Sequence, residues 1–190
     1  MIGSHNSWSY LKPTKWCMKP FAFMAKCQKY DIREQYEKYD VRIFDLRIRF
    51  TNTDEDILRV ALCHGLVEYP TTYLWGNLYY LNEKKDVYIR CILDLRGKNV
   101  DEQEQRDTFA DYIEYLKLTF PNLKFICGRE LPSWDKIADV PELELVEKYS
   151  SVCPPKIIDD WWPWLYAKLH NKKNREKYSD KNLLIDYVNI

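Results

Sequence analysis

Short apolar runs alternate along this chain with longer segments of helical periodicity, and this alternation limits the possible folds. The runs predict strands buried on both faces: Val41–Arg47, Leu58–Cys63, Val87–Leu95, Leu123–Cys127 and Leu183–Val188, with Leu143–Val146 a weaker candidate. The segments between them predict helices: Met24–Tyr39, Thr71–Lys84, Glu102–Phe120 and Asp159–Lys173. Strand–helix–strand repetition requires parallel strands with right-handed crossovers, which predicts an α/β fold.

The length of the chain restricts the form of the sheet. A complete eight-fold barrel usually needs at least about 200 residues, and this chain has 190. A barrel built from it must therefore be abbreviated, and an open sheet remains an alternative. No change in composition, flexible linker or internal repeat divides the sequence, so we expect residues 1–190 to form a single domain.

The charge of the chain argues against nucleic acid as a partner, and its hydropathy argues against a membrane-spanning segment. The 29 basic and 29 acidic residues cancel and form no basic block, so we expect no binding to nucleic acid. No apolar run is long enough to span a bilayer. The segment before the first motif is too short for a signal peptide, and the expected location is the cytoplasm or a membrane surface.

Six cysteines raise the question of disulfides or a metal. A chain of this length does not depend on a disulfide framework, and the sequence has no Cys-x-x-Cys pair and no Cys/His cluster with zinc spacing. We expect all six to be reduced thiols in the core: Cys17, Cys27, Cys63, Cys91, Cys127 and Cys153.

Two of the three histidines, His5 and His64, end apolar segments. In a parallel α/β sheet the carboxyl ends of the strands form the face that carries the active site. Asp45 and Arg47 end another run two positions apart, so their side chains point to the same side. Two imidazoles, a carboxylate and a guanidinium suit phosphoryl chemistry. The alternative is that the histidines only make structural hydrogen bonds and that Asp45 and Arg47 form a surface pair.

Three motifs resemble the X region of phosphatidylinositol-specific phospholipase C. They are Ile-Gly-Ser-His-Asn-Ser at 2–7, Val-Arg-Ile-Phe-Asp-Leu-Arg at 41–47 and His-Gly at 64–65. The resemblance covers about residues 1–65 and implies a distorted, incomplete TIM-like barrel. It also implies attack of the inositol 2-hydroxyl on its own phosphodiester, with release of diacylglycerol and a cyclic inositol phosphate.

The same resemblance implies roles for four residues. His5 would be the general base and His64 the general acid, while Asp45 would orient the site and Arg47 would stabilise the phosphate charge. The calcium-dependent members carry a carboxylate where this chain has Arg47, and the bacterial members carry an arginine. Asn6 resembles the calcium-dependent pattern instead, but a fixed positive charge opposes calcium binding. We therefore expect the bacterial type of enzyme, with no metal and no other cofactor.

Weaker resemblances mark residues that would contact the substrate. Asp94 and Arg96 end a strand where the family has residues around its catalytic cation, and the register leaves open which of them faces the site. Arg129 falls where the family has an arginine that contacts inositol hydroxyls, and Glu147 and Tyr149 resemble its acid-x-Tyr pair. Asn6 is a further candidate for substrate binding. Each could equally be an ordinary surface or capping residue.

Asp186 is the acidic residue inside the last apolar run. It resembles the last-strand aspartate that orients the base histidine in the family. In a barrel the last strand neighbours the first, which carries His5, and a buried carboxylate needs a partner. We predict a hydrogen bond between Asp186 and His5, with Glu147 the first alternative if Asp186 meets only water.

Three tryptophans, Trp161, Trp162 and Trp164, lie in four positions after Asp159 and Asp160. They either anchor a capped helix to the sheet or contact a lipid surface, where tryptophan is favoured. We expect a monomer that acts on a phospholipid and touches the membrane peripherally. The alternative functions are a catalytically idle phosphoinositol-binding relative and an enzyme similar to glycerophosphodiester phosphodiesterases.

Overall fold

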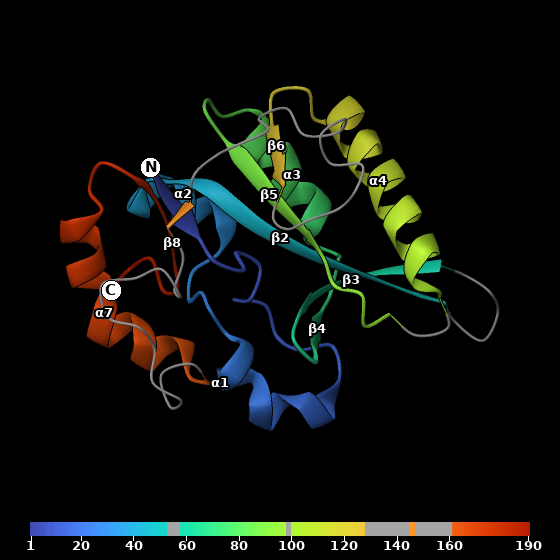
Figure 1. Cartoon of the computed structure of the whole chain (residues 1–190), viewed down its shortest axis with the longest axis horizontal. Coiled ribbons are helices and arrows are strands. Elements are labelled where there is room, and N and C mark those ends of the chain that lie inside the picture. Colours follow the sequence, from blue (N-terminus) through green and yellow to red (C-terminus); the bar gives the residue numbers. More distant parts are fainter. Residues whose placement is uncertain (53–57, 98–99, 128–144, 147–160) are drawn as a thin grey trace.

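The computed structural model describes residues 1–52, 58–97, 100–127, 145–146 and 161–190. Its strands form one eight-stranded sheet (Figure 1). The strands are β1 (Ile2–Ser4), β2 (Val41–Asn52), β3 (Leu58–His64), β4 (Val67–Tyr69), β5 (Tyr88–Leu93), β6 (Lys124–Cys127), β7 (Leu145–Val146) and β8 (Asn182–Ile185). The helices are a 3₁₀ helix η1 (Trp16–Phe21), α1 (Ala22–Ala25), α2 (Ile32–Tyr39), α3 (Leu74–Asn82), α4 (Glu102–Thr119) and α7 (Pro163–Lys177).

The parallel strands follow one another in the order β6, β5, β2, β1, β8 and β7. The last strand pairs with the first, with Ser4 opposite Ile185. Gly3 makes this pairing possible, because a Cβ there would lie 2.9 Å from Leu184 Cδ1 and 3.0 Å from Ile43 Cβ. This is an α/β fold, as the alternation of strands and helices predicted.

Strands β3 and β4 depart from the parallel pattern that the sequence predicted. β3 runs antiparallel to β2, from the pair Asn52–Leu58 to the pair Ile48–Leu62, and β4 runs antiparallel to β3. The five residues between β2 and β3 are too few for a crossover helix, which a parallel connection requires. The hairpin carries His64, at the end of β3, back along β2 and toward the end of β1.

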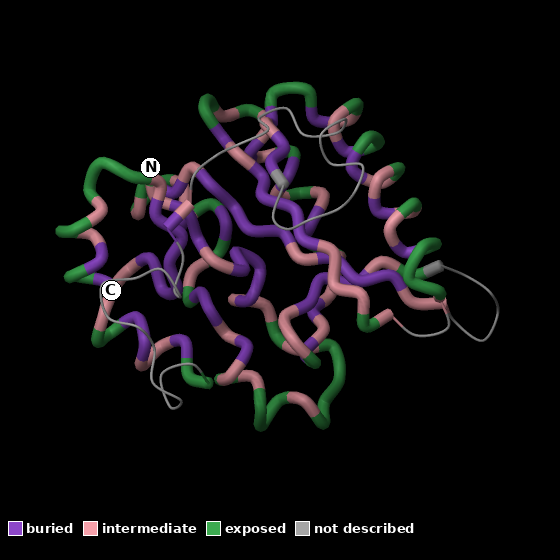
Figure 2. Tube along the Cα trace, in the orientation of Figure 1, coloured by how far each residue is buried: buried purple, intermediate pink, exposed green. Residues whose placement is uncertain are grey.

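The two faces of β2 have opposite character. Phe44, Leu46, Ile48 and Phe50 belong to the hydrophobic core, while the residues between them include Asp45, Arg47 and Arg49. Because side chains alternate along a strand, the core lies on one face of the sheet and a charged layer on the other. Figure 2 shows buried residues along the strands and exposed residues on the outer turns of the helices.

Helix α4 begins and ends close to the predicted bounds. Asp101 caps its N-terminus by accepting hydrogen bonds from the backbone N–H groups of Gln103 and Glu104, which satisfies donors that have no partner within the helix. Its buried residues include Phe109, Ile113 and Leu116. Leu118 lies outside this buried set and is 83% exposed.

The helix predicted over Met24–Tyr39 is broken. α1 ends at Ala25, and α2 begins at Ile32 with Asp31 as its cap. Between them the backbone N–H groups of Cys27 and Gln28 both donate to Ser9 Oγ. These tertiary hydrogen bonds replace the helical ones, so the helix stops although its apolar spacing continues.

Helix α7 starts later than predicted, because Pro163 occupies its first position. Proline fits the start of a helix and disfavours helical geometry in the residue before it. No helix in the described ranges is both long and apolar enough to cross a membrane.

Cys17, Cys27, Cys63 and Cys91 carry free thiols. Cys27, Cys63 and Cys91 are buried, as expected. Cys17 is exposed, which corrects the prediction that every cysteine lies in the core, because η1 holds it at the surface.

Candidate active site

The ends of β1 and β8 bring His5 and Asp186 together. Because Ser4 pairs with Ile185, the two residues that follow also lie side by side. His5 Nδ1 is 2.6 Å from Asp186 Oδ1, which is the contact that the sequence predicted. The next residues, Asn6 and Tyr187, both adopt a left-handed backbone, with φ of 44° and 46°. The chain therefore turns sharply away from each strand directly after the residue that enters the site.

Arg47 determines which ring nitrogen of His5 carries the proton. Its Nη2 is 2.5 Å from His5 Nε2, and a guanidinium can only donate hydrogen bonds. His5 Nε2 therefore accepts, which places the ring proton on Nδ1, where it is donated to Asp186. His5 is thus held as the tautomer whose unprotonated nitrogen points away from its carboxylate partner.

Asp45 is fully buried and accepts three hydrogen bonds. Its Oδ2 is 2.8 Å from the backbone nitrogen of Asn6 and 2.9 Å from Arg47 Nε, and its Oδ1 is 3.1 Å from Arg90 Nη1. Burial opposes ionisation of the carboxyl group, but the charges of Arg47 and Arg90 outweigh it and hold the pKa of Asp45 well below its ordinary value. Asp45 is thus a fixed anion that positions Arg47.

Arg90 was not singled out from the sequence. It lies in the middle of β5, is buried, and pairs in register with Asp45. An arginine inside an apolar strand is costly to bury without an anion, so its position within the run was a signal that could have identified it.

His64 faces His5 across the site. The ring centroids are 5.4 Å apart and the ring planes are nearly perpendicular, at 88°. His64 Nδ1 lies 3.0 Å from the Ala25 carbonyl and donates to it, so the unprotonated nitrogen of the neutral ring is Nε2. Burial, followed by the charges of His5 and Arg47, lowers the pKa of His64 to about 3.

A third arginine, Arg49, holds the turn that follows His64. Arg49 Nη2 donates to the Gly65 carbonyl at 2.5 Å, and Arg49 also pairs with Asp94 at 3.1 Å and Glu68 at 3.3 Å. Gly65 has a φ of 61°, a backbone conformation that favours glycine. Arg49 was also missed in the sequence, although it continues the spacing of Asp45 and Arg47 along β2.

Asp94 and Arg96 lie at the end of β5, and Asp94 also accepts from Arg96, with 2.9 Å between Arg96 Nε and Asp94 Oδ1. The contacts that the structure gives Asp94 are therefore with arginines and not with either histidine. Arg96 is exposed. Binding of substrate by Asp94 stays a prediction.

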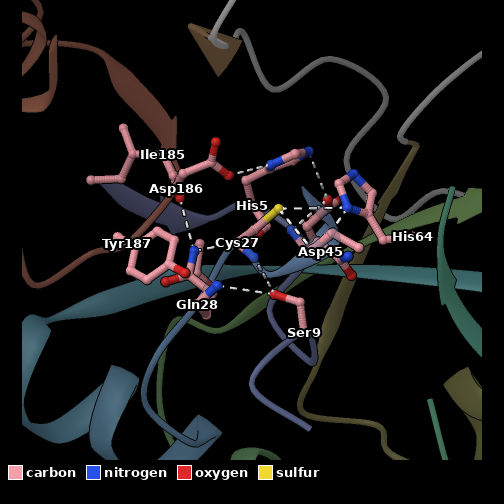
Figure 3. A network of polar contacts seen from close by, with 12 residues as sticks. His5, Ser9, Cys27, Gln28, Asp45, His64, Ile185, Asp186 and Tyr187 are labelled. Atoms are coloured by element: carbon pink, nitrogen blue, oxygen red, sulfur yellow. Dashed lines mark hydrogen bonds and ion pairs between the residues drawn. The ribbon is translucent and has the colours of Figure 1, made fainter. Parts of the chain in front are cut away.

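Cys27, in the break between α1 and α2, lies at the centre of the site. Its sulfur is 3.7 Å from His64 Nδ1, and Figure 3 shows it between the His5–Asp186 pair and the His64 ring. Burial, followed by the charge of Asp186, raises the pKa of the Cys27 thiol well above its ordinary value. The sequence predicts only a core position for Cys27, because nothing in its local pattern indicates proximity to His5 or His64.

Gln28 joins the segments that carry the site residues. Its side-chain amide donates to the carbonyls of His5 and Ile185 at 3.1 and 2.9 Å, and its Oε1 accepts from the backbone nitrogen of Val188 at 3.2 Å (Figure 3). It is fully buried. A single glutamine therefore links the chain after β1 to the chain after β8.

Among the residues expected to bind substrate, Asn6 is buried beside His5, and its Nδ2 has no hydrogen-bond partner among the described residues. It is a buried donor beside the proposed base. Arg129, Glu147 and Tyr149 lie outside the described residues.

An apolar pocket of about 440 Å³ opens beside His64. Its walls come from η1, α1 and the turn between β3 and β4, and they include Met18, Phe21, Met24, Leu66 and Val67. Several apolar side chains around this part of the molecule are exposed. They are Trp16, Phe21, Phe23 and Leu66.

The three tryptophans near the start of α7 differ in exposure. Trp161 is 62% exposed and Trp162 39% exposed, while Trp164 is partly buried. Trp162 contacts Trp164 at 5.6 Å between ring centroids, and it contacts Phe23 of α1 at 6.0 Å. Trp162 therefore both anchors the start of α7 and joins the exposed apolar surface of α1.

Taken together, these contacts form a site with two imidazoles that both carry their proton on Nδ1 but have different partners. One has a carboxylate behind it and an unprotonated nitrogen facing a guanidinium. The other is neutral and borders an apolar pocket. Such an arrangement can accept a proton from a hydroxyl group and can hold an anion beside the arginine.

Comparison with known proteins supports the fold. No family model and no curated protein matches the chain. The structure is similar to that of phosphatidylinositol-specific phospholipase C from Listeria monocytogenes, with a TM-score of 0.62 and 12% sequence identity over 98% of this chain and 87% of that one. This similarity confirms the prediction of an α/β fold of the abbreviated, TIM-like barrel type.

Proposed function

We propose that the protein cleaves phosphatidylinositol-like phospholipids to diacylglycerol and a cyclic inositol phosphate. The observation that carries the proposal is the His5–Asp186 pair, with Arg47 on the second nitrogen of His5 and His64 facing it at 5.4 Å. The attacking hydroxyl needs a base to take its proton, and the phosphate needs a cation to stabilise its charge. The leaving oxygen needs an acid to protonate it. The similarity of fold to a phosphatidylinositol-specific phospholipase C adds support.

His5 is proposed as the general base. Its Nε2 takes the proton of the inositol 2-hydroxyl, and Asp186 stabilises the imidazolium that forms. Arg47 leaves Nε2 to bind a non-bridging phosphate oxygen, while Asp45 keeps hold of Arg47 through Nε. Asn6 is proposed to donate from Nδ2 to a substrate oxygen.

His64 is proposed as the general acid, which requires that it carry a proton on Nε2. In the free site its pKa of about 3 makes it neutral at neutral pH. A bound phosphodiester is an anion, and it offsets the positive charge of Arg47, which helps to lower this pKa. We infer that substrate binding itself raises the pKa of His64 and so provides the acid.

The position of the apolar pocket supports a lipid as the leaving group. The pocket borders His64, the residue proposed to protonate the leaving oxygen, and its walls are apolar. Diacylglycerol would leave on that side. Trp161 and Trp162, with the exposed side chains of η1 and α1, are proposed to contact the membrane from which the substrate is drawn.

The proposed reaction needs no metal, because Arg47 supplies the cation that neutralises the phosphate. Arg47 and Arg90 on Asp45 make this carboxylate a poor calcium ligand, since its oxygens already accept from both. Activity should therefore persist when calcium is chelated.

The test is incubation of the protein with phosphatidylinositol in mixed micelles containing EDTA, followed by ³¹P NMR. A cyclic inositol phosphate signal is expected. Cleavage that needs calcium would contradict the metal-free proposal. Cleavage of glycerophosphodiesters but not phosphatidylinositol would favour the second enzyme class, and binding of inositol phosphate without turnover would favour an idle relative.

His5→Ala and His64→Ala should each lower kcat by about a hundredfold or more, the usual scale for general acid–base groups. His170→Ala is the matched control, because that histidine lies on α7 against Tyr166 and has no proposed role. Near-normal turnover in either of the first two variants would show that its histidine is not catalytic.

A further inference from the structure

Three groups that can bind metals meet within the proposed active site. The ligand atoms of His5, Cys27 and Asp186 all lie within 4.8 Å of one another. They come from the end of β1, the break between α1 and α2, and the end of β8. The proposed reaction uses His5 and Asp186 but gives the thiol no role.

A fourth donor, His64, lies next to this cluster: it contacts Cys27 but stands outside the group of ligand atoms that all lie within 4.8 Å of one another. His64 Nδ1 lies 3.7 Å from the Cys27 sulfur, and His5 Nδ1 lies 2.6 Å from Asp186 Oδ1. Ligand atoms around a tetrahedral zinc ion are separated by roughly 3.3–3.8 Å, given metal–ligand distances of about 2.0–2.3 Å. The sulfur–nitrogen distance already fits, and the His5–Asp186 pair must open by roughly 1 Å to admit an ion between its atoms.

We propose that this cluster is a binding site for zinc or a similar soft divalent cation, with Cys27, His5 and Asp186 as ligands and with His64 as the fourth ligand once its ring has moved toward them. Resting on the proposed function, we further infer that the bound ion inhibits the enzyme, since it occupies both catalytic histidines. Cys27 is the residue that gives the site this property.

The charges and protons of the proposed site balance. The Cys27 thiol loses its proton to solvent, and its thiolate together with the Asp186 carboxylate neutralises the two positive charges of the ion. The proton on His5 moves from Nδ1 to Nε2, which lies 4.0 Å from Asp45 Oδ2. Arg47 must then turn away from His5, and Nε2 and Asp45 must approach each other to form the hydrogen bond by which a carboxylate commonly supports a histidine ligand of zinc.

His64 can be released to the ion without leaving a buried carbonyl unsatisfied. It gives up its hydrogen bond to the Ala25 carbonyl, but Tyr69 Oη also donates to this oxygen, at 3.1 Å. The backbone that holds Cys27 is therefore kept in place when His64 changes partner.

The donor set selects the class of cation. A thiolate and two imidazoles suit zinc, cobalt and copper, whereas calcium and magnesium prefer a shell of oxygen atoms. The site offers one carboxylate to a hard cation. We therefore expect no binding of calcium or magnesium by this cluster.

The test measures metal binding directly and does not depend on activity. Purified full-length Cys17→Ser protein, which lacks the exposed thiol, is titrated with zinc in competition with a chromogenic chelator. One zinc per chain is expected, and the additional change Cys27→Ser should weaken binding by about a hundredfold or more, because loss of outer-shell partners alone costs 10–100-fold. Cys63→Ser, at another buried thiol, is the matched control and should bind as tightly as its parent.

Cobalt provides a second readout that needs no change at Cys27. Bound cobalt should give the visible absorption of a tetrahedral site and a thiolate-to-metal band in the near ultraviolet. Absence of that band, or zinc binding by Cys27→Ser within threefold of the parent (about 0.7 kcal/mol), would overturn the proposal. Circular dichroism shows whether Cys27→Ser is folded, and Asp186→Asn replaces it if it is not.

The two proposals can fail separately. Zinc binding with the cobalt thiolate band, but no cleavage of any phosphodiester, would support the metal site and contradict the proposed function. Cleavage that micromolar free zinc leaves unchanged, in protein shown to have bound zinc, would overturn the inhibitory role.

Discussion

At the scale of single residues, the site depends on which atom holds each proton. Arg47 faces one nitrogen of His5 and Asp186 faces the other, so the tautomer of His5 follows from its neighbours. His64 differs, because it donates to a backbone carbonyl and its pKa is lowered to about 3. Two histidines in one site thereby have the same tautomer but different electrostatic surroundings.

Asp186→Asn tests the proposed role of the carboxylate. An asparagine can still contact His5, but it carries no charge to stabilise the imidazolium formed during attack. We expect kcat to fall by about a hundredfold or more, with little change in KM and an unchanged circular dichroism spectrum. Asp180→Asn, at an exposed aspartate just before β8, is the control. Near-normal kcat in Asp186→Asn would contradict the role.

His64 also predicts how stability depends on pH. Its pKa is about 3 in the folded protein, against 6.5 for a histidine in an unfolded chain. Between these values the unfolded state binds a proton that the folded state does not, so the free energy of unfolding falls as the pH falls through this window. The contribution has a limiting slope of about 1.4 kcal/mol per pH unit.

Urea denaturation of the protein and of His64→Gln, at neutral pH and in the middle of the window, measures this contribution. The parent should lose more unfolding free energy than the variant as the pH falls, because only the parent contains His64. His170→Gln should follow the parent protein at both values. Parallel pH dependence of the parent and His64→Gln would show that His64 titrates normally.

At the scale of elements, the break between α1 and α2 creates the site. Residues that would have continued a helix instead bring Cys27 to the histidines and Gln28 to the ends of β1 and β8. The strands position the catalytic residues by register, and this irregular segment fixes them to one another.

Gln28→Met tests that connection. Methionine has a similar length but no polar atoms, so the carbonyls of His5 and Ile185 and the backbone nitrogen of Val188 lose a partner. The Ile185 carbonyl keeps the backbone N–H of His5 as a donor, but the other two groups are left unsatisfied. Each unsatisfied buried group costs about 1–3 kcal/mol, so we expect the free energy of unfolding to fall by about 2 kcal/mol or more. Gln103→Met, at an exposed glutamine of α4, should change it by less than about 0.5 kcal/mol. Urea denaturation monitored by circular dichroism measures both changes, and equal stability of the two variants would contradict the prediction.

At the scale of the whole molecule, the apolar surface and the proposed catalytic residues lie together. Residues of η1 and α1 line the pocket beside His64. Trp162, at the start of α7, contacts Phe23 of α1. Figure 1 shows these elements on the side of the sheet away from α4. A lipid surface in contact with them would present its head groups to the site.

Replacement of Trp161 and Trp162 by serine should weaken binding to vesicles of phosphatidylcholine and phosphatidylinositol. Burial of a large apolar side chain contributes about 1.5–3 kcal/mol, so the double variant should bind at least about tenfold more weakly. Cosedimentation with the vesicles measures the affinity. Leu118→Ser, on α4 and 83% exposed, is the control. Equal binding by all three proteins would contradict a membrane contact at the tryptophans.

Features that depend on local pattern could be predicted from the amino-acid order. The alternation of runs predicted the α/β fold, and α4 has nearly its predicted bounds because its cap and apolar spacing are local. His5 and Asp186 could be placed together because closure of a barrel makes the last strand a neighbour of the first. Asp45 and Arg47 share a side because strands alternate.

How the remaining residues meet depends on the three-dimensional arrangement. The direction of β3 depends on the short connection from β2, and His64 reaches His5 because that strand runs back. Cys27 and Gln28 looked like part of a helix, and Arg90 like part of an ordinary strand. Their partners are distant in sequence, and periodicity reports only which face of an element is apolar, not which polar group lies on the neighbouring segment.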